Sequence, residues 1–369
     1  MEVKFSYLDR QFSEIDDYMS KLRGVVISGD FTLGDPVAEF EEKFAKICRM
    51  PYAVGVGSGT DAIILSLKAL GVGPGDEVIT TTNTFIATVG AIVMAGATPV
   101  LVDSEDGFVI EASKIEDVIT DKTKAIIPVH YTGNVAEMET ISQLAKEHSL
   151  FIVEDACQSI KAEIDGNPVG SWGETAAFSL HPLKNLNVWG DGGIITTRSE
   201  DMAKKLRLLR NHGLINRDEV EIFGGNSRLD TLQAVVGNLL IDKTEWITRK
   251  RIENANRYDE AFSGMGNVIE IPKRRKGVRH VYHLYIVRVK KRDELLNNLN
   301  DRGVEAKIHY PIPVHLQKAA KYLGYKKGDF PKAESDADSI ITLPAHQHLT
   351  EEEIDYTIET VKEFYTNNG

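Results

Sequence analysis

The sequence predicts an α/β protein in which a mostly parallel sheet is flanked by helices and followed by a smaller α/β domain. Two observations predict this class. Short β-branched or apolar runs alternate with longer segments in which apolar residues return every three or four positions, as in parallel strands joined by crossover helices. The chain has 369 residues, about two to three times the usual domain length, so we expect two domains, or one large domain with an appendage.

The expected strands are short runs bounded by turn residues. They lie at 53–56, 78–81, 99–102, 125–128, 151–153, 176–179 and 193–197. The helices expected between them lie at 61–70, 86–95, 137–148 and 203–209. A loop rich in glycine at 71–76 ends the first of these helices.

The character of the chain changes near residue 248. A long charged helix is expected to run to about residue 262, with further elements at 281–289, 294–299 and 352–364. We therefore divide the chain into a large domain, 1–247, with an N-terminal segment at 1–30, and a small C-terminal domain, 248–369.

Composition excludes several classes of protein. Lys and Arg total 43 and Asp and Glu total 55, a net charge of −12, which makes nucleic acid or an anionic membrane a poor partner. The longest apolar stretch, 85–102, is interrupted by Thr88 and Pro99, so we expect a buried helix that feeds a core strand. The two cysteines cannot form a disulfide framework, and the first residues lack the apolar stretch of a signal peptide. We expect a soluble, cytoplasmic protein.

Charge is unevenly distributed along the chain. Residues 243–310 contain 16 Lys and Arg against 9 Asp and Glu, a local excess of 7 positive charges. One interpretation is a rim that attracts a phosphorylated ligand. The other, which we favour at this point, is that these are the solvated faces of helices.

Three loops contain residues suited to chemistry. The first, 55–61, is rich in glycine and opens a helix, so its free N–H groups favour a phosphate, although a plain tight turn is an equal alternative. It lacks the glycine spacing of a dinucleotide fingerprint.

The second and third loops carry a carboxylate and a lysine. Asp155 follows an apolar strand, where ligands bind in open α/β sheets; the alternative is a helix N-cap. Lys184 follows a strand and precedes a glycine cluster at 190–193. In a pocket, desolvation would lower its pKa and favour imine formation with a carbonyl, whereas the alternative is an exposed loop lysine.

Together these loops resemble a known signature set. The segments are Ser58-Gly59-Thr60-Asp61-Ala62, Glu154-Asp155-Ala156-Cys157-Gln158, Phe178-Ser179 with Lys184-Asn185 and Gly190-Asp191-Gly192-Gly193, and Asn226-Ser227-Arg228-Leu229-Asp230. They resemble the DegT/DnrJ/EryC1/StrS family of sugar aminotransferases, which use pyridoxal 5′-phosphate (PLP) and have the aspartate aminotransferase-like fold (fold type I). The resemblance extends from 29–34 to 309–313 and 343–344.

The resemblance implies roles for the central residues. Lys184 would be the Schiff-base lysine and the acid and base of the 1,3-proton shift. Asp155 would pair with the pyridinium nitrogen, which keeps the ring an electron sink. Gln158 would donate a hydrogen bond to the phenolic oxygen.

The resemblance also implies a set of cofactor contacts. Gly59, Thr60 and Ser179 would hold the phosphate. Phe85 would stack on the cofactor ring, with an ordinary core aromatic as the alternative.

The resemblance also implies residues that act across a dimer interface and residues that contact the substrate. Asn226 would reach the phosphate from the neighbouring subunit of a homodimer. Arg228 would orient a carboxylate or form a structural salt bridge, and His309, Tyr310 and His315 would line the sugar side. Neither of these histidines has metal-ligand spacing, and we expect no metal.

The implied reaction is a ping-pong transfer through a Lys184 aldimine. An amino acid, usually glutamate, donates nitrogen to a keto sugar linked to a nucleoside diphosphate, of the kind found in lipopolysaccharides or antibiotics. Relatives that dehydrate the sugar carry His at the lysine position, so Lys184 favours amino transfer, and Asp191 favours a 3-keto over a 4-keto sugar. The alternatives are a non-sugar or cyclitol keto substrate and a non-catalytic sensor that binds PLP or a nucleotide sugar.

Overall fold

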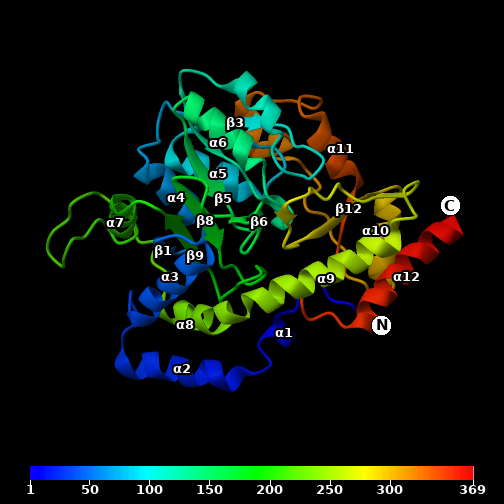
Figure 1. The fold of residues 1–369 in the computed structure, drawn as a ribbon, viewed down its shortest axis with the longest axis horizontal. Helices are drawn as coiled ribbons and strands as arrows, with labels where there is room; N and C mark the ends of the chain where they lie inside the picture. The colour runs from blue at the N-terminus through cyan, green and yellow to red at the C-terminus, as the bar shows by residue number, and fades with distance from the viewer. Residues whose placement is uncertain (369) are drawn as a thin grey trace.

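The computed structural model describes residues 1–368 and is built around a seven-stranded sheet with the order β1-β9-β8-β5-β4-β2-β3 (Figure 1). Its strands are β1 (Tyr52–Val56), β2 (Glu77–Thr81), β3 (Thr98–Val102), β4 (Thr123–Ile127), β5 (Phe151–Asp155), β8 (Thr175–Ser179) and β9 (Gly193–Thr197). β9 runs antiparallel to both its neighbours, and the remaining pairs are parallel. The mostly parallel sheet expected from the sequence is confirmed.

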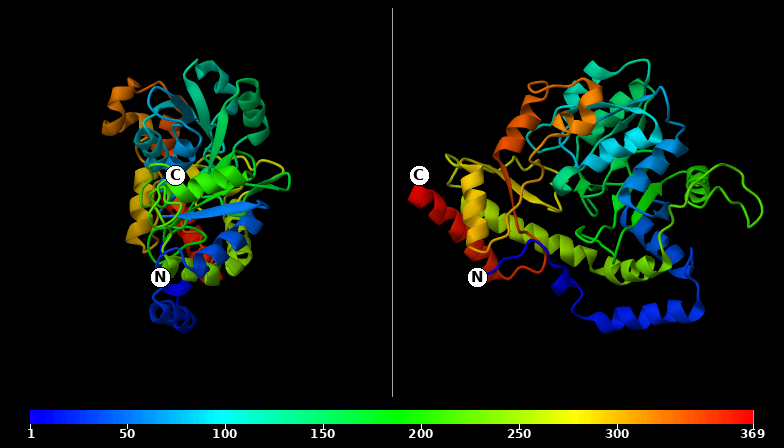
Figure 2. Two further views of the ribbon diagram at one scale, coloured as in Figure 1. Left: turned by 90° about the vertical axis from the view of Figure 1, so that its left-hand side faces the viewer. Right: turned by 180° about the vertical axis from the view of Figure 1, so that it is seen from behind.

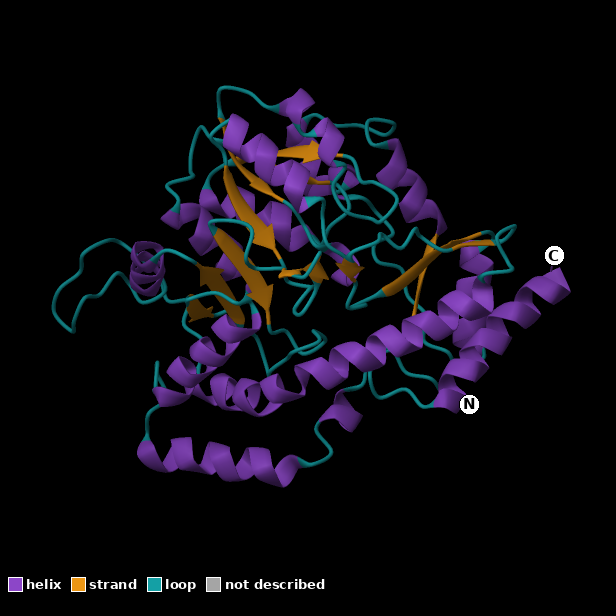
Figure 3. Ribbon diagram, in the orientation of Figure 1, coloured by secondary structure: helices purple, strands orange, loops and turns teal. Residues whose placement is uncertain are grey.

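Helices cover both faces of this sheet (Figure 3). One face packs against α4 (Gly59–Ala69), α5 (Ile86–Ala95) and α7 (Glu200–Leu209), and the other against α3 (Asp35–Ile47), α6 (Met138–Glu147) and α8 (Thr231–Leu240). Successive strand residues alternate between the two cores: Ile152 enters one and Val153 the other. Burial on both faces explains why these strands read as continuous apolar runs.

A second, antiparallel sheet has the order β10-β12-β13. Its elements are β10 (Ile269–Glu270), β12 (Tyr285–Val289) and β13 (Ile340–Leu343), covered by α9 (Thr244–Phe262), α10 (Arg292–Asp301) and α12 (Glu351–Asn368). Val3 packs in the core of this sheet and its backbone pairs with Val304. Tyr18 of the same N-terminal segment packs in the core of the large sheet. The segment therefore contacts elements on both sides of residue 247, and the domain boundary stays a prediction.

The remaining elements are short or peripheral. They are α1 (Leu8–Gln11), α2 (Ile15–Ser28), α11 (Pro331–Ser339) and a small sheet of β6 (Glu163–Ile164), β7 (Asn167–Pro168) and β11 (Val278–Arg279). Figure 2 shows α2 along one edge of the molecule and the segment after α7 projecting from its body. Within residues 1–368, no helix has both the length and the apolar character needed to cross a bilayer. The apolar stretch 85–102 forms α5 and β3, as expected.

Candidate active site

A cavity of about 410 Å³ lies where β5 and β8 end and where α4 begins. Its wall also includes residues that flank β12 and β13 of the second sheet. Ligands bind at such carboxyl ends in open α/β sheets. The predicted site residues that line it are Gly59, Thr60, Phe85, Asp155, Gln158, Ser179, Lys184, His309 and Tyr310.

One end of the cavity is the N-terminus of α4. The helix begins at Gly59, two residues before its expected start, because the Ser58 hydroxyl caps it by accepting from the Asp61 N–H at 3.1 Å. A Cβ atom on Gly59 would lie 2.8 Å from the Cβ of Ser179, so only glycine allows this approach. The first N–H groups of the helix and the Ser179 hydroxyl therefore lie together and suit a phosphate.

The Asp155 carboxylate is buried in the cavity wall. It accepts from the Thr88 hydroxyl at 2.7 Å and from the Cys157 N–H at 3.2 Å. The residues that directly follow Asp155 form no helix, and the next element is β6, so Asp155 is not a helix N-cap. Among residues 1–368, no side chain forms an ion pair with this carboxylate. A buried carboxylate of this kind is stabilised by a cation, and a protonated ring nitrogen meets that need.

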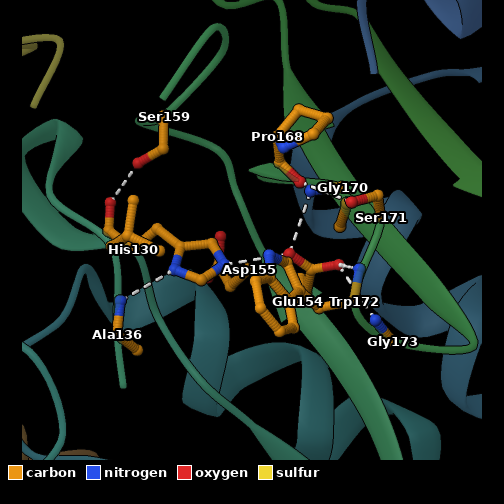
Figure 4. A network of polar contacts seen from close by, with 12 residues as sticks. His130, Ala136, Glu154, Asp155, Ser159, Pro168, Gly170, Ser171, Trp172 and Gly173 are labelled. Atoms are coloured by element: carbon orange, nitrogen blue, oxygen red, sulfur yellow. Dashed lines mark hydrogen bonds and ion pairs between the residues drawn. The ribbon is translucent and has the colours of Figure 1, made fainter. Parts of the chain in front are cut away.

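The adjacent Glu154 is not among the residues that line the cavity, and its carboxylate is held in a polar network of the fold (Figure 4). His130 accepts from the Ala136 N–H at its Nδ1, so its Nε2 donates to Glu154, at 3.1 Å. The same carboxylate accepts from the main-chain N–H groups of Gly170, Trp172 and Gly173. Of the two adjacent acids, Glu154 therefore stabilises the fold, whereas Asp155 lines the cavity.

Gln158 and two aromatic residues form another wall. The Oε1 atom of Gln158 accepts from the Thr132 N–H at 2.8 Å, which leaves its amide NH₂ group to donate. Phe85 is 49% exposed, so it is not an ordinary core aromatic, and its ring lies 5.7 Å from that of Tyr310. Burial raises the pKa of Tyr310 to about 12, with Asp155 adding to the effect, so its phenol stays protonated.

Lys184 is half-buried and its side chain lines the cavity. Burial lowers the pKa of its amine below the usual value, while Cys157 and Asp155 oppose this shift. A lysine with a lowered pKa holds an uncharged, nucleophilic amine more readily. Its carbonyl accepts from the hydroxyl of Tyr7, at 2.8 Å.

Histidines line the part of the cavity nearest the second sheet. The Nδ1 atom of His309 lies 2.9 Å from the Thr342 hydroxyl, and burial lowers the pKa of His309 to about 4. The Nδ1 atom of His283 is buried, and in the described part of the chain nothing hydrogen-bonds to it. Burial and the nearby Lys184 hold the pKa of His283 well below its usual value. Both rings are neutral near pH 7 and suit hydroxyl groups.

Sequence reasoning missed Tyr7, Thr88 and His283. A hydroxyl in the otherwise apolar helix at 86–95 was a usable signal for Thr88. Tyr7 and His283 belong to no motif and are brought to Lys184 by tertiary structure alone.

Three predicted residues lie outside this cavity lining. Asn226 is exposed, and its backbone pairs with Asn211. Arg228 donates to the side chain of Asn211 at 2.9 Å. His315 is buried and lies 3.0 Å from a carboxylate oxygen of Glu334. The structure thus does not bring these residues to Lys184 within one chain.

The site defines a class of protein before any comparison. An amine, a buried carboxylate and a helix N-terminus share one cavity of an α/β fold, an arrangement for chemistry on a flat, phosphorylated ligand held beside a lysine. Among residues 1–368, no group of acidic, histidine or cysteine side chains could hold a metal ion.

Comparisons with known proteins identify the family. The profile of the DegT/DnrJ/EryC1/StrS aminotransferase family matches residues 13–362. The chain is 41% identical over 368 residues, 99% of each chain, to a "Pleiotropic regulatory protein" of Geobacillus stearothermophilus. It is 39% identical over 341 residues, 92% of this chain and 90% of the other, to dTDP-3-amino-3,4,6-trideoxy-alpha-D-glucose transaminase of Streptomyces venezuelae.

A solved structure agrees with these matches. DesV of S. venezuelae, in complex with a ketimine intermediate, has a TM-score of 0.96 and 37% identity, with 98% of each chain covered. The chain belongs to the DegT/DnrJ/EryC1/StrS aminotransferase family. The family and the fold type expected from the sequence are confirmed.

Proposed function

We propose that this enzyme transfers an amino group from glutamate to carbon 3 of a keto sugar linked to a nucleoside diphosphate. Membership of the sugar aminotransferase family supports the reaction. The name of the S. venezuelae relative, a transaminase of a dTDP-linked 3-amino sugar, supports the nucleotide and the carbon. The single observation that carries the proposal is that Lys184 and Asp155 line one cavity beside the N-terminus of α4.

The cofactor is PLP, and the residues of the cavity fit it. When bound, PLP supplies an electron sink for the substrate carbon. Gly59, Thr60 and Ser179 hold its phosphate at the start of α4. Asp155, which lacks a cation of its own, pairs with the ring nitrogen.

The remaining cofactor contacts follow from the side-chain geometry. Gln158 uses its NH₂ group toward the phenolic oxygen, since its carbonyl oxygen is occupied by Thr132. Phe85, exposed at the cavity, packs on the ring.

Lys184 performs the proton chemistry in this proposal. Its lowered pKa makes the amine a nucleophile toward a carbonyl and a base that takes a proton from the substrate carbon. The same group would then return the proton to the carbon on the other side of the nitrogen, which completes the 1,3-proton shift. The Tyr7 hydroxyl holds the main chain at Lys184 while this occurs.

We assign the substrate side of the cavity to His309 and Tyr310. Asn226 completes the phosphate site of a neighbouring subunit in a homodimer, which accounts for its exposure and its place outside the cavity of its own chain. Arg228, bonded to Asn211, positions this segment, and we give His315 no contact with substrate. The two free cysteines, Cys48 and Cys157, are consistent with a cytoplasmic location.

A half-reaction assay tests the proposal. The enzyme is loaded as its pyridoxamine form and offered a panel of nucleotide-linked 3-keto and 4-keto sugars, with cyclitol and simple keto acids as controls. Recovery of the aldehyde absorbance with 3-keto sugars is expected. Recovery only with the non-sugar compounds would show a different acceptor.

A non-catalytic sensor is the second candidate, because the relative from G. stearothermophilus carries a regulatory name. Amino exchange by the native protein separates the two functions, and Lys184→Ala tests whether the exchange occurs at this site. In an aminotransferase this variant loses covalent attachment of the cofactor and turnover, whereas Lys205→Ala, which removes a lysine bonded to the Ala69 carbonyl, keeps both. A native protein that binds cofactor and sugar but never exchanges the amino group would be a sensor.

A further inference from the structure

A second cavity, of about 470 Å³, lies apart from the Lys184 site. Its wall includes residues 272–275 and 277–280, Ile252 and Asn256 of α9, and residues near the start of β12. The two cavities share a single lining residue, Leu284. Its volume falls in the range of small-molecule sites.

The charged side chains that line this cavity are all positive. They are Lys273, Arg274, Arg275 and Arg279, and no Asp or Glu is part of the lining. These are four of the 16 Lys and Arg residues of segment 243–310.

Acidic residues outside the lining hold the arginines in place. Asp259 binds Arg274 through two hydrogen bonds of 2.8 and 2.9 Å. Arg275 lies 3.6 Å from Glu137, and Arg279 lies 2.5 Å from Glu245. These ion pairs hold the three guanidinium groups in position, so less conformational entropy is lost when the groups bind a ligand.

Two donors in this wall lack acceptors. The Nε atom of Arg275 is buried and, within the described residues, hydrogen-bonds to nothing. No acidic group of residues 1–368 pairs with the ammonium group of Lys273, which is exposed. A buried donor without a partner is costly, and an anion in the cavity relieves that cost.

The lining also contains apolar residues. They include Ile252, Pro272, Leu284 and Ile286, so the cavity offers both cationic donors and apolar surface for a flat ring. We propose that this cavity is a second ligand site, which takes a nucleoside monophosphate.

Thr132 links this cavity to the Lys184 site. It lines the second cavity, its hydroxyl lies 3.1 Å from Nε2 of His280, and its N–H donates to Gln158 at 2.8 Å. Thr132 has a φ of +64°, a conformation that costs a β-branched residue energy. A ligand that shifts His280 or Thr132 would act on Gln158 through these two hydrogen bonds, so the second site is placed to modulate the first.

The binding test compares two charge reversals in one loop. Lys273→Glu changes the cavity wall, and Lys276→Glu makes the same change three residues away, outside the lining. The holoenzyme and both variants are titrated calorimetrically with AMP, UMP, adenosine and inorganic phosphate, and thermal unfolding verifies that each variant is folded. We expect a nucleotide to bind the native enzyme, about tenfold weaker binding by Lys273→Glu, and less than about twofold weaker binding by Lys276→Glu.

Three results would overturn the proposal: no nucleotide binding, equal weakening by the two reversals, or inorganic phosphate binding as tightly as the nucleotides. The link through Thr132 has its own measurement. Nucleotide should change the visible absorbance of the bound cofactor in the native enzyme but not in Lys273→Glu, and an unchanged spectrum would refute the link. Only this second measurement rests on the proposed function. Calorimetry therefore distinguishes a failure of the second site from a failure of the proposed function.

Discussion

The hydroxyl of Tyr7 donates a 2.8 Å hydrogen bond to the main-chain carbonyl of Lys184, 177 positions further along the chain. The guanidinium group of Arg251 lies over the Tyr7 ring, 5.2 Å from its centroid. Arg251 in turn donates to the carbonyls of Tyr282 and His283, just before β12. The N-terminal segment therefore ties the backbone that carries the amine to the second sheet.

Tyr7→Phe should lower kcat with little loss of stability. The variant keeps the buried ring but leaves the Lys184 carbonyl without its donor, and the amine loses its fixed position. We expect about a five- to tenfold lower kcat, since one neutral hydrogen bond is worth about 1 kcal/mol. Steady-state kinetics and thermal unfolding measure the two effects.

Tyr365→Phe is the matched control for this change. It removes another tyrosine hydroxyl bonded to a carbonyl, that of Lys290, away from the cavity. Equal losses of kcat in the two variants would contradict a positioning role for Tyr7.

A substitution at Asp155 should lower the rate of catalysis, whereas one at Glu154 should lower the stability of the fold. Asp155→Asn keeps the shape of the side chain but removes the charge that faces the ring nitrogen, so kcat should fall at least about 100-fold. Glu154→Gln sets an NH₂ group among main-chain donors, and unfolding should become about 3 kcal/mol easier. Kinetics and urea unfolding of both variants test these expectations. A large loss of stability in Asp155→Asn together with a large loss of kcat in Glu154→Gln would refute the two roles.

Acid should destabilise the fold through His346. Its Nδ1 accepts from the His348 N–H, and its Nε2 donates to the Lys4 carbonyl, so protonation breaks the first bond. Burial, with Arg251 nearby, lowers the pKa of His346 to about 3, against about 6.5 in an unfolded chain. Between these values the unfolded state binds more protons, so the free energy of unfolding falls as pH falls below about 6.5.

His346→Gln removes this titration. Its free energy of unfolding should depend less steeply on pH, by up to about 1.4 kcal/mol per pH unit. Urea unfolding at pH 7, 6 and 5 measures the slopes, and identical slopes in the native protein and the variant would count against His346 as the titrating group.

The local sequence pattern predicted where the strands of the large sheet lie, but it did not predict that β9 runs antiparallel to its neighbours. The run that forms β9 is buried on both faces like the parallel strands of the same sheet, so nothing in its composition marks it as antiparallel. The helices α3 and α8 were not predicted. In α3, Val37, Phe40 and Phe44 have helical spacing, but the charged residues between them obscured the pattern.

Local sequence pattern also indicated some residues of the site but not others. Asp155 and Lys184 could be predicted because strand ends and glycine loops mark where an open sheet binds ligands. Tyr7 and His283 could not, because their importance arises from long-range contacts. His315 has the same residue type as His309, yet burial beside Glu334 turns it away from the Lys184 cavity.

Mixing inactive subunits should restore activity if Asn226 serves the neighbouring site. Lys184→Ala and Asn226→Ala homodimers are each expected to be inactive or nearly so, because each site lacks one of the two residues. In a mixed dimer, one site receives both native residues and the other receives neither. Random exchange makes half of the dimers mixed, so refolding an equal mixture should recover about a quarter of native activity. Were Asn226 to serve its own chain, every site in the mixed dimer would retain one defect, and no activity would return.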